Sequence, residues 1–311
     1  MIDTSTPGPL AITGATGFVG RRVLALGART SGRPLRALTR RPQPPQPGVK
    51  WVVGDLNDSN ALARLCRGAD AVLHIAGVVN APDADGFRIG NAIGTANVLA
   101  AAATVPRFVH VSSLAARQPR LSLYGASKAE ADASVMASRL DWVIVRPPGV
   151  YGPGDAEMRD LFRLAQRGLG LAPGGPDARI SLIHVDDLAR ALLALATSGP
   201  SREIIELDDG SGGYAHADHA AAIARALGRP AVRMIPVGAG LLNAAAGIAT
   251  LIATIQGQLP KLSRDRAGYL AHPDWVARGG NERLAGLWQP QVGLDDGLAD
   301  TVRDYRERGW L

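Results

Sequence analysis

The sequence predicts an α/β fold in which a doubly wound parallel sheet is followed by a smaller C-terminal lobe. Short apolar runs alternate with helical patterns in the first half, a glycine-rich stretch follows the first run, and this rhythm changes after about residue 150. Strands that are apolar along their centres and separated by helices indicate a parallel sheet covered on both faces. We therefore expect two parts, residues 1–150 and residues 151–311.

The first half contains six apolar runs with the length and composition of buried strands. Right-handed crossovers between them would give a doubly wound sheet. The second half has shorter strand patterns among longer helices, as expected of a lobe at the carboxyl edge of the sheet. The expected strands cover residues 10–13, 34–40, 50–55, 71–77, 107–113 and 141–147, then 178–184, 203–207 and 231–236, and the first-half helices cover 18–30, 59–67, 86–104 and 124–138.

The composition is that of an ordinary globular protein, with 46% hydrophobic and 20% charged residues. Cys66 is the single cysteine, so no disulfide can form within the chain, and the first ten residues lack the pattern of a signal peptide. Both features favour a cytoplasmic location. The net charge of +6 comes from scattered arginines, which argues against nucleic-acid binding and favours a phosphorylated small molecule as partner.

Residues 234–260 form a stretch without any charged side chain, long enough to span a bilayer. The stretch is rich in alanine and glycine, contains five Asn, Thr or Gln residues, and has Pro236 and Pro260 near its ends. We therefore favour a buried or partner-facing helix, and a membrane-associated segment is the alternative.

The stretch TGATGFVG (13–20) lies between the first strand and the first helix. Gly14 permits a tight turn, Gly17 lets a pyrophosphate approach the backbone, and Gly20 allows close packing of helix on sheet. This placement favours a phosphate-binding loop over a merely tight turn. We expect its cofactor-binding residues to be Gly14, Thr16, Gly17, Phe18, Val19 and Gly20.

The second expected strand ends in Thr39-Arg40-Arg41, without the acidic residue that bonds the ribose 2′-hydroxyl in NAD sites. Arg40, and with it Arg41, offers guanidinium donors to a 2′-phosphate. We therefore favour NADP as the cofactor, with NAD as the alternative. The other interpretation of these arginines is that they are solvent-exposed loop residues.

Tyr124 and Lys128 stand four positions apart in SLYGASKAE (122–130), in a chain with only three lysines. Residues at this spacing share one face of a helix, so the two side chains would meet. A nearby ammonium lowers the pKa of a phenol, ordinarily about 10, and makes it a usable acid or base. The alternatives are an exposed helix pair, or an ion pair of Lys128 with Glu130 or Asp132.

Taken together, these motifs resemble an extended short-chain dehydrogenase/reductase of the NAD-dependent epimerase/dehydratase group. The resemblance is specific to the superfamily and much less specific to one reaction. It implies a Rossmann NAD(P)-binding domain over 1–150, a substrate-binding lobe over 151–311 and a homodimer through helices that flank the sheet. The matching stretches are TGATGFVG, GDL (54–56), HIAG (74–77), VSS (111–113), YGASK (124–128), RPPGVYGPG (146–154) and HVDDLARA (184–191).

The resemblance also implies roles at the catalytic centre. Tyr124 would be the acid/base, and Lys128 would serve both the phenol and the nicotinamide ribose. Ser113 would bond the substrate oxygen, with Ser112 as its close alternative. Asn91 resembles the asparagine that completes the site, unless it is an ordinary polar residue of a helix.

The remaining implied contacts concern the cofactor. Asp55 would bond the adenine amino group, and Leu56 would pack on the base. The ribose and nicotinamide side would be lined by Ala76, Gly77, Val78, Ser112, Pro147, Gly149 and Val150.

The leading hypothesis is an NADP(H)-dependent oxidoreductase that acts on a hydroxyl or ketone of a small, apolar substrate. A nucleotide-sugar epimerase or dehydratase with tightly bound NAD is the alternative, although the interval from Ser113 to Tyr124 is short for that group. A non-catalytic NADP(H)-binding sensor or assembly subunit is the second alternative. No metal is expected, because His216 and His219 begin an alanine-rich helical pattern without an identifiable third ligand.

Overall fold

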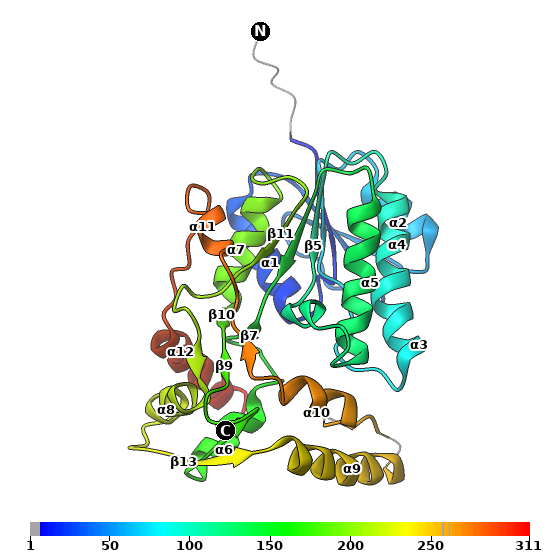
Figure 1. Ribbon diagram of the computed structural model, residues 1–311. Helices are drawn as coiled ribbons and strands as arrows, with labels where there is room; N and C mark the ends of the chain where they lie inside the picture. The colour runs from blue at the N-terminus through cyan, green and yellow to red at the C-terminus, as the bar shows by residue number, and fades with distance from the viewer. Residues whose placement is uncertain (1–6, 257, 261) are drawn as a thin grey trace.

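Seven parallel strands form the central sheet, in the order β3-β2-β1-β4-β5-β6-β11, which confirms the predicted doubly wound architecture (Figure 1). A computed structural model describes residues 7–256, 258–260 and 262–311; residues 1–6, on which part of the signal-peptide expectation rests, lie outside the described residues. The strands are β1 (Leu10–Thr13), β2 (Leu35–Thr39), β3 (Val49–Val53), β4 (Ala71–His74), β5 (Arg107–Val111), β6 (Trp142–Arg146) and β11 (Glu203–Glu206).

Helices cover both faces of this sheet. Successive residues of a strand point to opposite faces, so Leu10 and Ile12 of β1 enter one buried cluster and Ala11 enters the other. Burial on both sides explains why the strands are apolar along their whole length. The first face is covered by α1 (Phe18–Thr30) and α7 (Val185–Leu195), and the second by α2 (Ser59–Cys66), α4 (Gly94–Ala101) and α5 (Leu123–Ala137).

Three short helical segments stand near the carboxyl edge of the sheet. They are α3 (Ala84–Phe87), the π-helix η1 (Arg88–Ile93) that continues into α4, and the 3₁₀-helix η2 (Leu114–Arg117) after β5. The strand order reverses at β1, which pairs with β2 on one side and β4 on the other. In open sheets of this kind, ligands bind outside the carboxyl ends of the strands at such a reversal.

The smaller lobe lies below this edge of the sheet in Figure 1. It combines short strands with helices drawn from the second half of the chain. Its strands are β7 (Gly149–Tyr151), β8 (Leu169–Pro173), β9 (Arg179–Ile180), β10 (Leu182–His184), β12 (Tyr214–Ala215), β13 (Arg233–Val237) and β14 (Asp274–Trp275), and its helices are α6 (Arg159–Gln166), α8 (His216–Ala226), α9 (Ala239–Ile255), α10 (Arg264–Leu270) and α12 (Leu294–Glu307). The short helix α11 (Gly280–Arg283) lies instead beside β11 of the large sheet (Figure 1).

The second half of the chain also contributes to the large sheet. β11 pairs with β6 at the sheet margin, and α7 packs against α1. The division at residue 150 stays a prediction for the two functional parts, and the sheet layer itself draws on residues from both sides of it.

The uncharged stretch 234–260 forms the end of β13 and the whole of α9. Leu242 and Ala246 of this helix are buried against Ala267 of α10, whereas larger aliphatic side chains on its other side are exposed. Of the helices in the part of the chain that the structure describes, none is both long and apolar enough to cross a membrane.

Candidate active site

The phosphate loop is shaped by close backbone contacts. Gly14 has φ +73°, and a Cβ atom there would lie 2.5 Å from the amide nitrogen of Ala76. A Cβ atom on Gly20 would lie 2.1 Å from the carbonyl oxygen of Gly14. The loop and the first turn of α1 therefore require glycine at both positions, as the sequence predicts.

The N-terminus of α1 is open to an anion. Gly17 precedes the helix without any capping side chain, and no acidic residue stands in the first turn. Thr16 and Phe18 are partly exposed beside it, while Val19 packs against the core of the sheet. The free amide groups and the positive end of the helix dipole suit the pyrophosphate of a dinucleotide.

Arg40 and Arg41 follow β2 directly and are exposed. Within the described residues, neither guanidinium forms a salt bridge. Asp55, after β3, is exposed and uses one carboxylate oxygen to accept a hydrogen bond from the amide of Asn57, at 2.8 Å. Leu56 packs against the apolar cluster beneath it. These four residues follow β2 and β3 directly, and their contacts with the adenosine end of the cofactor stay predictions.

Asn91 holds the segment that follows β4. Its Oδ1 accepts from the amide of Val78 at 2.8 Å, and its Nδ2 donates to the carbonyl of Val78 at 3.0 Å and to Ser127 Oγ at 2.8 Å. Asn91 is buried within the π-helix η1, a local geometry that is frequent at functional sites. The side chain thus fixes the backbone of Val78, and it packs closely on Gly77, where a Cβ atom would lie 2.9 Å from Asn91 Oδ1.

Ser113 and Tyr124 are brought together by two helix N-termini. Ser113 caps η2 and accepts from the amide of Ala115 at 3.2 Å, while Ser122 caps α5 and sets the first turn that carries Tyr124. Burial raises the pKa of the Tyr124 phenol, and a hydrogen bond with Ser113 offsets part of this rise. Ser112 is buried one residue earlier, and its amide donates to Val145.

Lys128 is buried, with only 4% of its surface exposed, and its Nζ donates to the carbonyl of Val111 at 2.8 Å. The same nitrogen lies 3.7 Å from the position that a Cβ atom on Gly77 would take. Burial lowers the pKa of Lys128 to about 8. A surface ion pair with Glu130 is excluded, because Glu130 pairs with Arg88 at 3.1 Å.

The expectation that the ammonium lowers the pKa of Tyr124 is wrong for this structure. The pKa of the phenol is raised, because its burial outweighs the favourable contacts, and Lys128 is directed to Val111. Tyr124 is therefore protonated at neutral pH.

A buried polar network below Lys128 was missed from the sequence. Asp132, one helical turn further along α5, accepts from Arg146 Nε at 2.9 Å and lies 3.4 Å from His110 Nε2. Burial would raise the pKa of Asp132, but His110 and Arg146 outweigh it and hold the pKa below its usual value. The one sign of this network in the sequence is that Asp132 stands four residues after Lys128, a spacing that puts both on one face of a helix. His74 stacks on His110, with ring centroids 5.3 Å apart.

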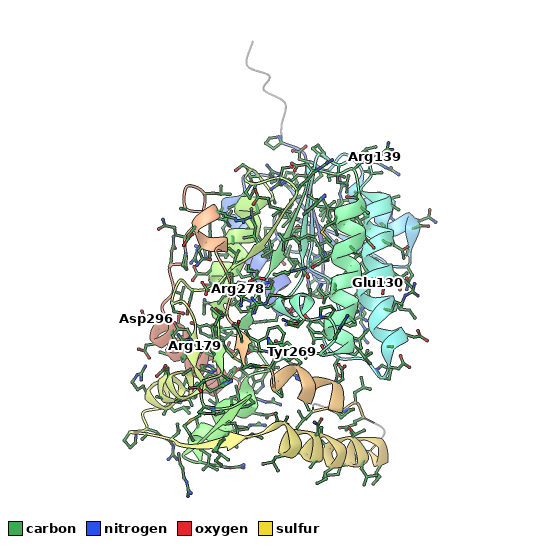
Figure 2. All side chains as sticks on the ribbon, viewed as in Figure 1. Glu130, Arg139, Arg179, Tyr269, Arg278 and Asp296 are labelled. Carbon is green, nitrogen blue, oxygen red and sulfur yellow. The ribbon has the colours of Figure 1, made fainter. Side chains whose placement is uncertain are left out.

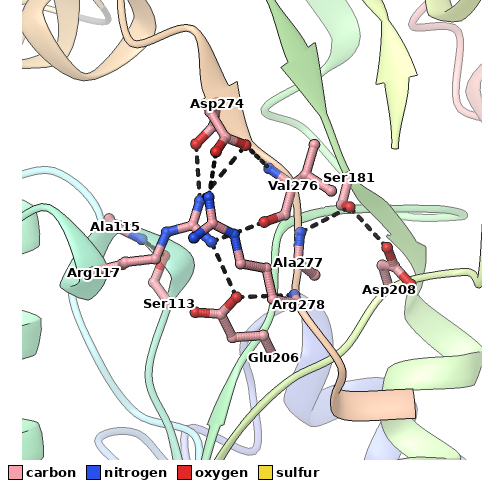
Figure 3. Close-up of polar contacts among 10 residues, drawn as sticks. All are labelled: Ser113, Ala115, Arg117, Ser181, Glu206, Asp208, Asp274, Val276, Ala277 and Arg278. Carbon is pink, nitrogen blue, oxygen red and sulfur yellow. Dashed lines mark hydrogen bonds and ion pairs between the residues drawn. The ribbon is translucent and has the colours of Figure 1, made fainter. Parts of the chain in front are cut away.

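The 3₁₀-helix that begins at Ser113 is tied to the smaller lobe. Arg117 Nη1 donates to Glu206 Oε2 at 3.1 Å and to the carbonyl of Val276 at 2.8 Å, and Nη2 donates to the carbonyl of Asp274 at 2.8 Å (Figure 3). The position of Ser113 therefore depends on residues more than ninety positions away in the sequence as well as on its own strand.

An apolar cavity of about 350 Å³ opens from this site into the smaller lobe. Leu114 and Gly149 line it next to Ser113, and Tyr269 lines it where the lobe approaches the sheet (Figure 2). Burial, together with the neighbouring Tyr124, raises the pKa of Tyr269 to about 12. Among the side chains that the structure describes, none that lines the cavity carries a full charge; those with a polar atom are Ser181, His216, His219, Tyr269 and Trp275.

Two other predicted contacts have structural tasks. The carbonyl of Pro147 accepts from the amide of Leu114 at 3.0 Å, and Val150 pairs with Ile183 between β7 and β10 while packing on the sheet core.

His216 and His219 line the cavity. In the described ranges, no group of three or more His, Cys, Asp or Glu is arranged to hold a metal. A separate cavity of about 540 Å³ between α8 and α12 contains none of the predicted site residues.

The doubly wound sheet, the glycine loop and the Ser113–Tyr124–Lys128 group together define a protein that binds a nicotinamide dinucleotide. The profile of a family described as NAD(P)H-binding matches residues 14–198. The chain is 37% identical to a ceramide reductase of Caulobacter vibrioides over 316 residues, covering 99% of this chain and 98% of that protein. It is 28% identical to a UDP-glucose 4-epimerase of Vibrio cholerae over 215 residues, covering 60% and 66%.

A solved structure of an enzyme from Bordetella bronchiseptica, in complex with NAD⁺, superimposes with a TM-score of 0.74 at 20% identity over 97% of this chain and 99% of that one. That likeness concerns the fold. The chain belongs to the NAD(P)-binding extended short-chain dehydrogenase/reductase superfamily, in its epimerase/dehydratase group. It is an enzyme of the short-chain dehydrogenase type, so the non-catalytic alternative is set aside.

Proposed function

We propose that the protein is an NADP(H)-dependent reductase of a ketone carried by an apolar, lipid-like substrate. The observation that carries this proposal is the uncharged cavity, which begins beside Ser113 and Tyr124 and continues between apolar side chains of the lobe. A ligand pocket of this size and lining selects for alkyl groups. The name of the Caulobacter relative, a ceramide reductase, supports a lipid as the substrate class.

The reduction requires a hydride on the carbonyl carbon and a proton on its oxygen. When bound, the nicotinamide supplies the hydride. Ser113 would hold the carbonyl oxygen by donating a hydrogen bond, and Tyr124 would donate its proton to that oxygen as negative charge develops there. Because its pKa is raised, the Tyr124 phenol has its proton in place at neutral pH.

Lys128 and Asn91 would act on the cofactor side. The ammonium of Lys128, between the end of β5 and Gly77, would donate to the ribose hydroxyls of the cofactor. Asn91 is a positioning residue, because all three of its hydrogen bonds hold Val78 and Ser127. The residues present therefore fit a nicotinamide dinucleotide.

NADP is the proposed cofactor form. Arg40, exposed and free of any salt bridge among the described residues, stands at the end of β2 where the 2′-position of the adenine ribose is expected. A guanidinium offers paired donors to a phosphate. Asp55 lies on the next strand, β3, and remains the proposed partner of the adenine amino group.

Nucleotide-sugar epimerisation is the less well supported candidate. A sugar diphosphate needs several charged or polar partners, and no charged side chain lines the cavity in the described part of the chain. Two of its polar side chains are already engaged, since Ser181 Oγ bonds Asp208 at 2.8 Å and Trp275 Nε1 bonds the Tyr269 carbonyl at 3.0 Å.

The test is a comparison of substrates with purified protein. Long-chain ketones in detergent, short water-soluble ketones and nucleotide sugars are each incubated with NADPH or NADH, and cofactor oxidation and products are measured. We expect NADPH oxidation with long-chain ketones and an alcohol product. Cofactor-neutral conversion of a nucleotide sugar, with NAD copurifying, would contradict the proposal.

A further inference from the structure

The outward side of α9 is a continuous apolar stripe. We define the outer stripe as the residues at helical spacing that face away from the lobe: Leu241, Ala244, Ala245, Ile248, Leu251, Ile252 and Ile255. Leu251 is 63% exposed and Ile255 is 78% exposed. A surface helix normally presents polar residues to water, so an uninterrupted aliphatic stripe indicates a surface that contacts something apolar.

The opposite side of the same helix forms part of the proposed substrate cavity. Leu242 packs with Val237 in one buried cluster, and both residues line the cavity. Leu262 and Leu270, which follow α9 in the chain, line it as well. The segment therefore separates the cavity from the surface by the thickness of one helix.

The chain segment that contains α9 carries charge of one sign. Between Asp218 and Asp265 the sequence contains five basic residues and no acidic one. Arg229 and Arg233 are exposed. A second copy of the chain would bring like charges together if two outer stripes paired, which disfavours self-association through this helix. An anionic surface would instead be attracted.

We propose that the outer stripe docks the protein on the surface of an anionic lipid bilayer, with α9 lying in the plane of the interface. In Figure 1 α9 is at the lower margin of the lobe, the side remote from the sheet, so a flat surface can reach it. Aliphatic side chains would enter the acyl boundary while the arginines contact headgroups. α9 has 17 residues, and within the described chain no helix is suited to span a bilayer.

This proposal rests in part on the proposed function, because a lipid ketone dissolved in a bilayer would then lie next to the wall of its binding cavity. The surface argument itself needs neither cofactor nor turnover. The two ideas can therefore fail separately in experiment.

The test is flotation of the full-length protein with vesicles of phosphatidylcholine, with or without phosphatidylglycerol, in the absence of cofactor and substrate. We expect binding to the vesicles that contain phosphatidylglycerol, weakened by salt. The double variant Ile248→Gln/Leu251→Gln should bind at least tenfold more weakly, because two exposed aliphatic side chains no longer enter the bilayer. Arg229→Gln/Arg233→Gln should lose most of the preference for anionic vesicles.

The matched control is Met136→Gln, which removes an exposed apolar side chain on α5 and should bind like the wild type. Thermal unfolding and NADPH binding confirm that each variant is folded. Wild-type protein that does not float, or an Ile248→Gln/Leu251→Gln variant that floats as well as the wild type, would overturn the proposal. So would a wild-type dimer that this variant converts to monomers without a change in vesicle binding. Vesicle binding without turnover of any lipid ketone would overturn the proposed function alone.

Discussion

The ammonium of Lys128 donates to the carbonyl oxygen of Val111, with 2.8 Å between Nζ and O. This bond ties the first turns of α5 to the end of β5, two residues before Ser113. It places a buried cation between Tyr124 and the Gly77 segment. The residues proposed as proton donor, oxygen-binding serine and cofactor-facing cation are thereby held on one rigid support.

Tyr124→Phe should lower kcat by roughly 10³-fold, because loss of a positioned general acid typically costs 10²- to 10⁴-fold. NADPH affinity, measured by fluorescence titration, should change less than twofold, since the phenyl ring keeps its packing near Phe87. Tyr269→Phe is the control, as it removes a second cavity phenol from the same neighbourhood. Turnover retained in Tyr124→Phe would remove Tyr124 from the mechanism.

The pH dependence of kcat/KM should follow the ionisation of Lys128. Burial lowers the pKa of Lys128 to about 8, so the ammonium is lost as pH rises through that value, and kcat/KM should fall above it. Tyr124, whose pKa is raised, stays protonated over the same range. The rate of ketone reduction between pH 6 and about pH 10 is the measurement, and a flat profile across that range would contradict the assignment.

Asp132→Asn should shift the fall of kcat/KM at high pH to lower pH, because the Asp132 carboxylate raises the pKa of Lys128. The variant should also lose about 3 kcal/mol of unfolding free energy, since Arg146 is left with a broken buried pair. Urea unfolding measures the second effect. Glu130→Gln changes an exposed residue two positions from Lys128 and should leave both the pH profile and the stability unchanged.

Arg40→Ala should weaken NADPH binding by about tenfold or more, or ~1.4 kcal/mol, and leave NADH binding unchanged, because only the 2′-phosphate loses a partner. Arg139→Ala removes the same charge from an exposed position at the far end of α5 and serves as the control (Figure 2). Equal losses for the two cofactors would show that Arg40 does not read the 2′-position.

Gly20→Ala should prevent tight binding of either cofactor. The new Cβ would lie 2.1 Å from the Gly14 carbonyl, so the loop or α1 must shift, at a cost of about 1–3 kcal/mol of stability. Gly240→Ala is the matched control, because nothing lies within 4 Å of the added Cβ there. Calorimetric unfolding with and without NADPH measures both effects, and a Gly20→Ala variant stabilised by NADPH as strongly as the wild type would contradict the prediction.

Most of the sheet could be predicted from the sequence, because a strand that is buried on both faces appears in the sequence as a short apolar run. The strands at 10–13, 71–77 and 107–113 are confirmed close to their expected positions. The pairing of β11 with β6 could not be predicted, since the chain between these two strands runs through the smaller lobe. A short run of four residues carries no information about its partner.

In the candidate site, too, the local features could be predicted from the sequence and those that join distant segments could not. The glycines of the loop and the Tyr124–Lys128 spacing are local patterns with a local physical meaning. The direction of the Tyr124 pKa was predicted with the wrong sign, because desolvation depends on which segments cover the phenol. The Asp132–Arg146 pair joins a helix to a strand, and neither residue signals it alone.

The sequence by itself determined the class of fold, the glycine loop and the residues proposed to face the cofactor, because each depends on the period of a helix or strand and on the steric freedom of glycine. Only the tertiary structure decided the apolar cavity, the burial of Lys128 and the outward stripe of α9. These features arise where segments distant in the sequence meet, or fail to meet, so the free energy that shapes them is a property of packing and of the water it excludes.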